Sequence, residues 1–551
     1  MSNNLTQAGI FQSDKEYKCP VRTVNDLRKL VDAANIQRHR YVKQTLDSFC
    51  ADNCNKIIGI YGLRRTGKSV LMQSKALELI EQGRRIAYFD FELNRRAKFD
   101  WLIADLQLCK EDGIEFVFID EITFLHEKTS ADLTGDEYIV PEFPERGMEL
   151  YAHFAQCHGK IILSGTDSYS LSIAKGSSLF DRMKFIHTTH IPYREYQNLI
   201  GPVTILEYRN HGGVLPRADM NWDEYVETAI INNVLYSTEA ITVARSKHLY
   251  LTRLRRDEIK SLILYALAMT NIEFVEGLYR RKFNYIDLSD EIDLSGKSEN
   301  PIDFPKEFVE DVRSEIKRRM ALSHIESEQL GYYLAEMENI LHSLDVIVPY
   351  TLETITYSRG KPVIHSSIVY ALNISGLRKY QLAKTVYAIE DVINFSVTSD
   401  SKKLLTQKVR ESAEGRLIES TVLAETVDRL PDDVFSITQC KSHESEIDMI
   451  VRNKRSNVLW LFEVKRSTKV VPEQVQHFHS DEIMKSYTSR YGEAKTVNYC
   501  VIYRGKTAQV EFENVEYVAV NYINIEEYLL DISKCFQLDV DDSWSDSWIF
   551  V

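Results

Sequence analysis

The hydrophobic pattern of the N-terminal part of the chain alternates between amphipathic stretches and short apolar runs. Apolar residues recur at helical spacing over residues 25–49, and a second helix is expected from Ser69 to Gln82. The runs between and after these helices have the length of buried strands. They are Lys56–Gly62, Arg85–Asp90, Phe116–Asp120 and Lys160–Ser164. Strands that alternate with helices predict a parallel sheet with helices on both faces, in a domain over residues 25–200.

The middle of the chain has a different pattern. Residues 201–240 are expected to form a lid or linker, and residues 241–389 are mostly helical. One predicted helix, residues 329–343, has apolar side chains at helical spacing and leads into the apolar run Val346–Tyr350. A turn follows at Arg359-Gly360. A helix followed by a small β-hairpin predicts a winged-helix-like region.

The last part of the chain returns to strands that alternate with helices, over residues 390–535. We expect an N-terminal extension at residues 1–24 and an acidic tail at residues 536–551, which carries two tryptophans. A tail of this composition is either disordered or a docking segment for a protein partner.

Composition narrows the class of protein. The chain has 551 residues, of which 44% are hydrophobic and 27% charged, as in ordinary globular proteins with several domains. No apolar run reaches the roughly 18 to 20 residues that span a bilayer. The first residues are polar, unlike a secretory signal. The eight cysteines are scattered, so we expect reduced thiols and a cytoplasmic protein without membrane contact.

The formal net charge of −14 argues against a non-specific coat on nucleic acid. Local contact with DNA is compatible with this charge, because basic residues cluster between positions 245 and 319. These clusters are either solvated helix faces or DNA contacts. Their members are Arg245, Lys247, Arg253, Arg255, Arg256, Arg280, Arg281, Lys282, Lys317, Arg318 and Arg319.

The turn after the first apolar run fits the phosphate-binding pattern G-x-x-x-x-G-K-[ST] at every constrained position. Gly62 and Gly67 allow consecutive backbone N–H groups to point at phosphate oxygens, at the start of a helix. Lys68 is expected to reach the β- and γ-phosphates, and the Ser69 hydroxyl to bind Mg²⁺. The full predicted nucleotide-binding stretch is Gly62, Arg64, Arg65, Thr66, Gly67, Lys68, Ser69 and Val70.

A second element, which ends in acidic residues, supports nucleotide hydrolysis. The apolar run Phe116–Asp120 ends in two acids, about fifty residues after the phosphate loop. Asp120 is expected to bind Mg²⁺, and Glu121 to polarise the attacking water as a general base. At the end of a later run, Ser164 or Thr166 is expected to orient this water or to sense the γ-phosphate. Arg182 is either an arginine finger that acts from a neighbouring subunit or a surface ion-pair residue.

The C-terminal part contains a predicted hairpin formed by residues 445–451 and 457–465. Alternation places an apolar set, Ile447, Met449, Val451, Trp460, Phe462 and Val464, on one face. The other face collects Glu446, Asp448, Glu463 and Lys465. Clustered carboxylates beside a lysine predict a Mg²⁺ site at Asp448 and Glu463, with Lys465 orienting water or stabilising charge. The alternative is a sheet edge that merely carries charges.

These motifs resemble those of the prokaryotic, or archaeal-type, P-loop ATPases of the AAA class that carry a C-terminal PD-(D/E)xK nuclease-like domain. The resemblance is carried by the following segments, of which Asp181-Arg182 is a partial match because that family usually has Gly-Arg. They are Gly62–Ser69 with Arg64-Arg65, Asp120-Glu121-Ile122, Ser164-Gly165-Thr166, Asp181-Arg182, Pro192–Glu195, Gly212–Pro216 and the acid–lysine set of the hairpin.

The resemblance implies an α/β fold in three parts: a P-loop NTPase parallel sheet, a helical winged-helix-like middle region and a C-terminal restriction-endonuclease-like domain. It also implies that Glu419 supplies a further catalytic acid from an upstream helix, beside Asp448, Glu463 and Lys465. The expected function is an ATP- and Mg²⁺-dependent ATPase coupled to a nuclease that acts on DNA, in a homo-oligomer. The alternative is a nucleotide-dependent switch whose C-terminal domain only binds partners or forms oligomers.

Overall fold

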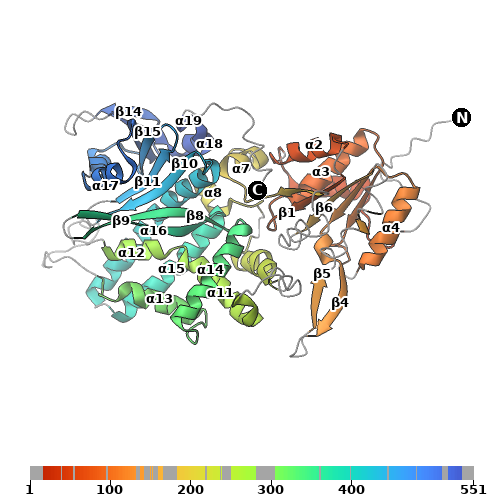
Figure 1. Cartoon of the computed structure of the whole chain (residues 1–551), viewed down its shortest axis with the longest axis horizontal. Helices are drawn as coiled ribbons and strands as arrows, with labels where there is room; N and C mark the ends of the chain where they lie inside the picture. The colour runs from red at the N-terminus through yellow and green to blue at the C-terminus, as the bar shows by residue number, and fades with distance from the viewer. Residues whose placement is uncertain are drawn as a thin grey trace.

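The computed structural model places two sheets at opposite ends of the molecule, with helices between and around them (Figure 1). It describes residues 17–536 with internal gaps. The gaps are 39, 54–55, 95–96, 132–136, 142–148, 151, 153–158, 166–182, 217–219, 236–237, 239–249, 281–303, 359–360, 397–398, 443–445, 480 and 512–518.

The N-terminal sheet has five strands in the order β2-β3-β6-β1-β7, and every pair in it is parallel. The strand that precedes the phosphate loop therefore lies in the interior of the sheet, beside β6. The bounds are β1 Ile57–Tyr61, β2 Ile86–Asp90, β3 Phe116–Asp120, β6 Lys160–Gly165 and β7 Met183–His187. The first four strands are those predicted from the apolar runs, and their burial on both faces explains why these runs are continuous.

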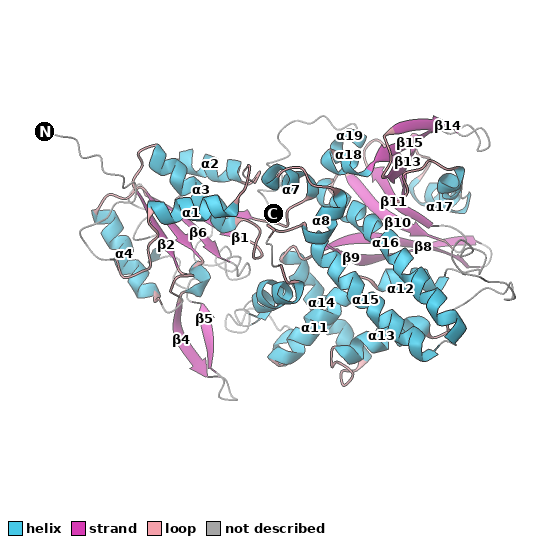
Figure 2. Cartoon of the chain, turned by 180° about the vertical axis from the view of Figure 1, so that it is seen from behind, coloured by secondary structure: helices cyan, strands magenta, loops and turns pink. Residues whose placement is uncertain are grey.

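Helices cover both faces of this sheet, as Figure 2 shows. One apolar core joins α1 (Val24–Ala34), α2 (Lys43–Ala51) and α3 (Lys68–Glu81) to one face. A second core joins α4 (Phe99–Glu111) to the other face. The prediction of one helix over residues 25–49 is wrong, because Asn35 adopts a left-handed conformation with φ of 48° and ends α1.

Part of the predicted N-terminal extension belongs to this domain. Val21 forms a bridge with Phe89 at the edge of the sheet, and the Cys19 backbone N–H donates to the Asp105 carboxylate at 2.7 Å. Farther along the chain, β4 (His126–Ala131) and β5 (Glu137–Pro141) pair as a hairpin that projects from the domain (Figure 1).

The C-terminal sheet has eight strands in the order β14-β15-β13-β12-β11-β10-β8-β9. One face packs against α16, α18 and α19, and the other packs against α17 and a short 3-10 helix. The strand bounds are β8 Ile347–Ser358, β9 Lys361–Leu372, β10 Phe435–Lys441, β11 Glu446–Asn453, β12 Val458–Val464, β13 Thr496–Tyr503, β14 Ala508–Glu511 and β15 Ala519–Asn524.

The hairpin β8–β9 departs from the expected wing. It follows α14 as the pattern predicted, but β8 pairs in parallel with β10, from Thr351↔Thr438 to Thr354↔Lys441. The hairpin therefore extends the C-terminal sheet, and this sheet crosses the predicted boundary between residues 389 and 390. The winged-helix assignment stays a prediction.

Helices of the middle region enclose a large apolar core of their own. Among the described residues, no single helix is long and apolar enough to cross a membrane, although the bent pair α11 and α12 passes that test together. The described α-helices that follow β7 are α7 Tyr193–Ile200, α8 Ile205–His211, α9 Trp222–Tyr225, α11 Arg256–Met269, α12 Ile272–Arg280, α13 Phe308–Arg319, α14 Ser327–Ser343, α15 Ser375–Ser396, α16 Ser399–Arg429, α17 Asp481–Tyr491, α18 Ile525–Leu530 and α19 Ile532–Cys535.

Two short helices tie the N-terminal domain to the C-terminal sheet. Tyr193, Tyr196 and Leu199 of α7 and Tyr208 of α8 belong to the same apolar core as the inner face of β11 and β12. The predicted lid at residues 201–240 thus contributes to the packing of the C-terminal half of the molecule.

Candidate functional site

The phosphate loop connects β1 to α3 and contains three residues with positive φ. These are Gly62 at 144°, Arg65 at 66° and Gly67 at 90°. A Cβ atom at Gly62 would lie 2.2 Å from the carbonyl oxygen of Thr188, so this position requires glycine. The loop conformation is thus fixed by its sequence and by the segment that follows β7.

Lys68 begins α3 and folds its side chain back across the loop. Its ammonium donates to the carbonyl oxygens of Gly62 and Leu63, both at 2.9 Å, and the residue is buried. Burial lowers the pKa of Lys68, while the charges of Glu121 and Asp120 act in the opposite direction. The ammonium therefore sits inside the loop, where phosphate oxygens would be stronger acceptors than carbonyls.

Asp120 is the centre of a hydrogen-bond network at the carboxyl ends of the strands. Its Oδ1 accepts from the Ser69 hydroxyl at 3.2 Å and from the Ser164 hydroxyl, and its Oδ2 accepts from the Tyr88 hydroxyl at 2.8 Å. Burial, followed by the charge of Glu121, raises the pKa of Asp120 to about 6. The structure thus brings together Ser69, Asp120 and Ser164, which are separated by 51 and 44 positions in the sequence.

Glu121 lies at the turn directly after β3, with φ of 57° and a mostly buried side chain. Its backbone N–H donates to the Ser164 hydroxyl at 3.1 Å, so Ser164 bridges the two acids. The negative charge of Glu121 also acts on Lys68. The other predicted residues of this turn region, Thr166 and Arg182, lie outside the described residues.

The two arginines of the loop contact the segment predicted as a lid, and Thr66 contacts the segment after β7. Arg65 donates to the Leu215 carbonyl at 3.0 Å and accepts from the Leu215 backbone N–H at 2.8 Å. The Arg64 carbonyl accepts from the Tyr225 hydroxyl at 3.2 Å. Thr66 hydrogen-bonds to Thr188 through their hydroxyls at 2.8 Å.

Arg40, which no sequence pattern indicated, contacts the loop at Thr66. Its guanidinium donates to the carbonyl oxygens of Thr66, Thr189 and His190 and forms a buried ion pair with Glu195 at 2.8 Å. Glu195 is the last residue of the Pro192–Glu195 motif, so the motif indicated one of the two partners of this ion pair. A small hollow of about 10 Å³ lies beside Gly67 and Val70. It is lined by Ile36, Arg40, Gly67, Val70, Leu71, Leu199 and Leu215.

The second predicted site lies where β11 and β12 separate. Their pairing runs from Arg452↔Leu459 to Met449↔Phe462. Beyond it, Asp448 accepts a hydrogen bond from the Val464 backbone N–H at 2.7 Å. Lys465 Nζ is 2.5 Å from the Glu463 carboxylate and 3.8 Å from that of Asp448.

Glu419 joins this group from α16, as the resemblance implied. Its charge acts on both Glu463 and Lys465, and it also forms an ion pair with Arg416 at 3.8 Å. Arg416 is a half-buried neighbour that no sequence pattern indicated, and it donates to the Tyr350 hydroxyl at 3.3 Å. All four predicted residues, Glu419, Asp448, Glu463 and Lys465, therefore lie at one place in the structure.

Glu463 is the most unusual member of the group. Its Oε1 is buried and has no hydrogen-bond partner among the described residues. Burial, followed by the charge of Asp448, raises the pKa of Glu463 well above its ordinary value despite the ammonium of Lys465. A free carboxylate oxygen close to other carboxylates matches the oxygen donor set that a hard divalent cation binds.

One expectation about the hairpin was wrong. Met449, Val451, Trp460, Phe462 and Val464 share one apolar face, but Ile447 packs on the opposite face. The cause is a β-bulge, because two steps along β10, from Thr438 to Cys440, match three steps along β11, from Ile450 to Ile447. The bulge lies at Asp448 and Met449, so it changes the direction of the strand where the acid is presented.

The parallel sheet, the phosphate loop and the Asp-Glu pair at the end of β3 define the N-terminal domain as a P-loop nucleotide-binding domain. More closely, residues 54–197 match the family model described as an AAA domain. This segment of the chain thus has the fold and the motifs of an AAA-type P-loop domain. The match ends before the helices of the middle region and the eight-stranded sheet.

Similar solved structures include AMPPCP-bound DnaA from Aquifex aeolicus, at 15% identity and a TM-score of 0.22, over 55% of this chain and 84% of that chain. Another is the Walker-type ATPase PabY2304 of Pyrococcus abyssi, at 14% identity and a TM-score of 0.29, over 62% of this chain and 94% of that chain. No curated protein matches the chain.

Tyr88 offers a first test of the network at Asp120. Replacing Tyr88 by phenylalanine removes the donor to Oδ2 and leaves the fully buried ring in place. If Asp120 binds Mg²⁺, loss of this outer partner should weaken Mg²⁺ binding. The Mg²⁺ concentration that gives half-maximal ATP hydrolysis should then rise by about tenfold. Titration of the hydrolysis rate with Mg²⁺ measures this effect. Tyr503→Phe, which removes a hydroxyl from the other sheet, is the control, and equal Mg²⁺ dependence in both variants would contradict the role of Tyr88.

Proposed function

We propose that the AAA-type domain binds ATP with Mg²⁺ at Gly62–Ser69 and hydrolyses it. The observation that carries this proposal is the network in which Ser164 connects Asp120 to Glu121 while Asp120 also accepts from Ser69. These groups come from β3, β6 and the start of α3, and they meet beside the ammonium of Lys68.

Each residue then has a distinct role. The backbone N–H groups from Gly62 to Val70 surround the phosphates, and Lys68 binds their β- and γ-oxygens. Ser69 and Asp120 hold Mg²⁺, which neutralises charge on the phosphates. Glu121 accepts a proton from the attacking water, and Ser164 orients Glu121 and Asp120. A role for Arg182 from a neighbouring subunit stays a prediction, as does the homo-oligomer.

A purine base would have to widen the hollow beside Val70, which has room for about one water molecule. This hollow lies at the first turn of α3, next to Gly67, and four of its lining residues are aliphatic apart from Val70: Ile36, Leu71, Leu199 and Leu215. Apolar side chains at this place would contact the flat face of a base, while Arg40 is already engaged with backbone carbonyls and Glu195.

We further propose that the C-terminal sheet carries a metal-dependent nuclease site that acts on DNA. Glu463 Oε1 has no hydrogen-bond partner in the part of the chain that the structure describes, and its place beside Asp448 and Glu419 supports a divalent cation there. A bound Mg²⁺ would supply a water of lowered pKa and polarise the phosphodiester. Asp448 and Glu463 would hold the ion, Lys465 would stabilise charge on the phosphate, and Glu419 would complete the acidic set.

The basic clusters give DNA contact less support than the sequence suggested. Arg318 and Arg319 both pair with Glu315 at 2.8 Å, and Arg255 pairs with Glu258 at 3.4 Å. Local acids thus compensate these charges. Arg245, Lys247, Arg281 and Lys282 lie outside the described residues, as does the acidic tail from residue 537, so a DNA surface there and a protein partner at the tail stay predictions.

One experiment tests both sites. Purified protein is incubated with labelled duplex, branched and single-stranded DNA in Mg²⁺ or Mn²⁺, with and without ATP, and cleavage and phosphate release are both measured. Lys68→Ala should abolish ATP hydrolysis, and Asp448→Ala should abolish DNA cleavage while hydrolysis continues. Cleavage that survives in Asp448→Ala would overturn the second site. ATP hydrolysis without cleavage of any DNA would instead favour a nucleotide-dependent switch whose C-terminal domain does not cut.

A further inference from the structure

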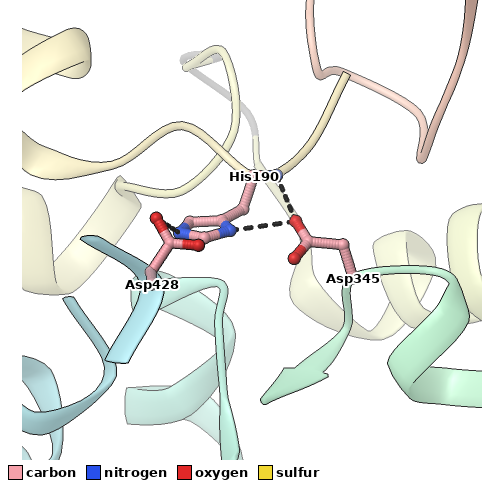
Figure 3. Close-up of side chains that lie close together, drawn as sticks. All are labelled: His190, Asp345 and Asp428. Carbon is pink, nitrogen blue, oxygen red and sulfur yellow. Dashed lines mark hydrogen bonds and ion pairs between the residues drawn. The ribbon is translucent and has the colours of Figure 1, made fainter. Parts of the chain in front are cut away.

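A buried histidine joins three distant parts of the chain (Figure 3). His190 follows β7 by three residues, Asp345 lies between α14 and β8, and Asp428 is close to the end of α16. The His190 Nδ1 atom is 2.9 Å from Asp345 Oδ2, and its Nε2 atom is 3.8 Å from Asp428 Oδ2. The imidazole is 2% exposed, so this contact is shielded from solvent.

The arrangement fits an ion-paired bridge better than a metal site. The two carboxylates face different nitrogens of the imidazole ring, and one ion cannot be bound by both nitrogens (Figure 3). Asp345 already accepts three hydrogen bonds: Oδ2 accepts from the backbone N–H and Nδ1 of His190, and Oδ1 accepts from Asn373 at 2.7 Å. Although burial opposes protonation, the carboxylates of Asp345 and Asp428 raise the pKa of His190 to about 9.

The bridge is connected directly to the phosphate loop. Thr188 lies two residues before His190, and its backbone N–H donates to the Tyr61 carbonyl at 2.7 Å. Its hydroxyl hydrogen-bonds to Thr66, and its carbonyl fills the space that a Cβ at Gly62 would need. Arg40 reinforces the connection, because it donates to the carbonyls of both Thr66 and His190. A shift of the loop must therefore move the segment that carries His190.

On its other side the bridge is connected to α16. Glu425 of this helix accepts from the Tyr193 backbone N–H at 3.2 Å and from the Tyr208 hydroxyl at 2.6 Å, close to Asp428. Glu419 lies on the same helix, nine residues before Asp428, which corresponds to about 13 Å along the helix axis. A continuous helix transmits a displacement at one end to the other, so the position of Glu419 depends on the contacts of Asp428.

We infer that His190 couples the phosphate loop to α16, so that the nucleotide bound at the loop controls the position of Glu419 in the C-terminal site. This regulation rests on the proposed function of both sites. The segment 188–195 is the coupling element, with Thr188 as its contact on the loop and His190 as its contact on α14 and α16.

Hydrogen–deuterium exchange of the full-length protein tests the coupling without requiring DNA cleavage. Exchange of α16 is compared without nucleotide, with ADP and with a non-hydrolysable ATP analogue. In the wild type, the analogue should change exchange in α16 by about fivefold or more. In His190→Gln this change should be lost, although the loop still binds the analogue. The control Asp433→Asn removes an exposed ion pair to Arg455 just beyond α16 and should respond as the wild type does.

Asp428→Asn provides a second variant, on the helix side of the bridge and away from the loop. It should also lose the response of α16, and it decides the question if His190→Gln does not fold. A response that persists in either folded variant, or a wild type in which α16 does not respond to the analogue, would overturn the coupling. Hydrogen–deuterium exchange can be measured even if the protein cuts no DNA. Failure of the nuclease proposal can therefore be distinguished from failure of the coupling.

Discussion

ATP hydrolysis is expected to fall by at least about a hundredfold when Glu121 is replaced by glutamine, while ATP binding changes only a few-fold. Glutamine has the same shape but cannot accept the proton of the attacking water. The Glu121 backbone N–H donates to Ser164, and this contact does not depend on the side chain. The positions of Asp120 and Ser164 should therefore survive the change, together with the part of the loop that binds phosphate.

The measurement is the rate of phosphate release, compared with ATP affinity from equilibrium titration. Glu115→Gln is a matched control, because Glu115 directly precedes β3 and lies at the opposite end of the strand from Glu121. This control should hydrolyse ATP at the wild-type rate. If Glu121→Gln loses binding together with hydrolysis, Glu121 supports the structure of the loop and is not the base.

Glu463→Gln is expected to abolish metal-dependent cleavage and, in the absence of metal, to make the protein more stable. The raised pKa of Glu463 determines the direction of this change in stability. A carboxyl group whose folded pKa is raised contributes stability at low pH, and this contribution is lost as the pH rises from the ordinary pKa toward the raised one. Glutamine mimics the protonated form, so at neutral pH the variant should have a larger free energy of unfolding than the wild type.

Thermal unfolding with EDTA and with Mn²⁺ measures this prediction. Mn²⁺ should raise the unfolding temperature of the wild type and leave that of Glu463→Gln unchanged, because the variant lacks a ligand. Glu353→Gln is the control, since Glu353 is a buried glutamate on β8 of the same sheet and contacts Tyr491. It should respond to Mn²⁺ as the wild type does. An equal response of Glu463→Gln would remove Glu463 from the metal site.

The elements that depend on local sequence were predictable. The strand that ends in Asp120 is apolar at every position before the acid, and the phosphate loop contains glycine where φ is positive at positions 62 and 67. In both cases the residue types follow from constraints within a few residues. The order of the strands then brings Ser69, Asp120 and Ser164 together, as expected for the carboxyl edge of a parallel sheet.

Features that depend on distant contacts were not predictable. The bulge at Asp448 and Met449 reverses the side of Ile447, although the sequence alternates without a break. Asn35 interrupts an apparently continuous apolar stripe, because one residue in a left-handed conformation is enough to end a helix. The bridge at His190 requires residues 155 and 238 positions away, Asp345 and Asp428, and no local pattern marks any of the three.

The parallel pairing of β8 with β10 also limits how this protein can be divided. β8 ends at Ser358 and β10 begins at Phe435, so the C-terminal sheet is completed by a hairpin encoded well before it. A fragment that begins at residue 390 would expose the N–H and C=O groups of β10 as an open edge, which is a template for aggregation. During synthesis the β8–β9 hairpin must likewise wait for β10, so the middle and C-terminal parts complete their folding together.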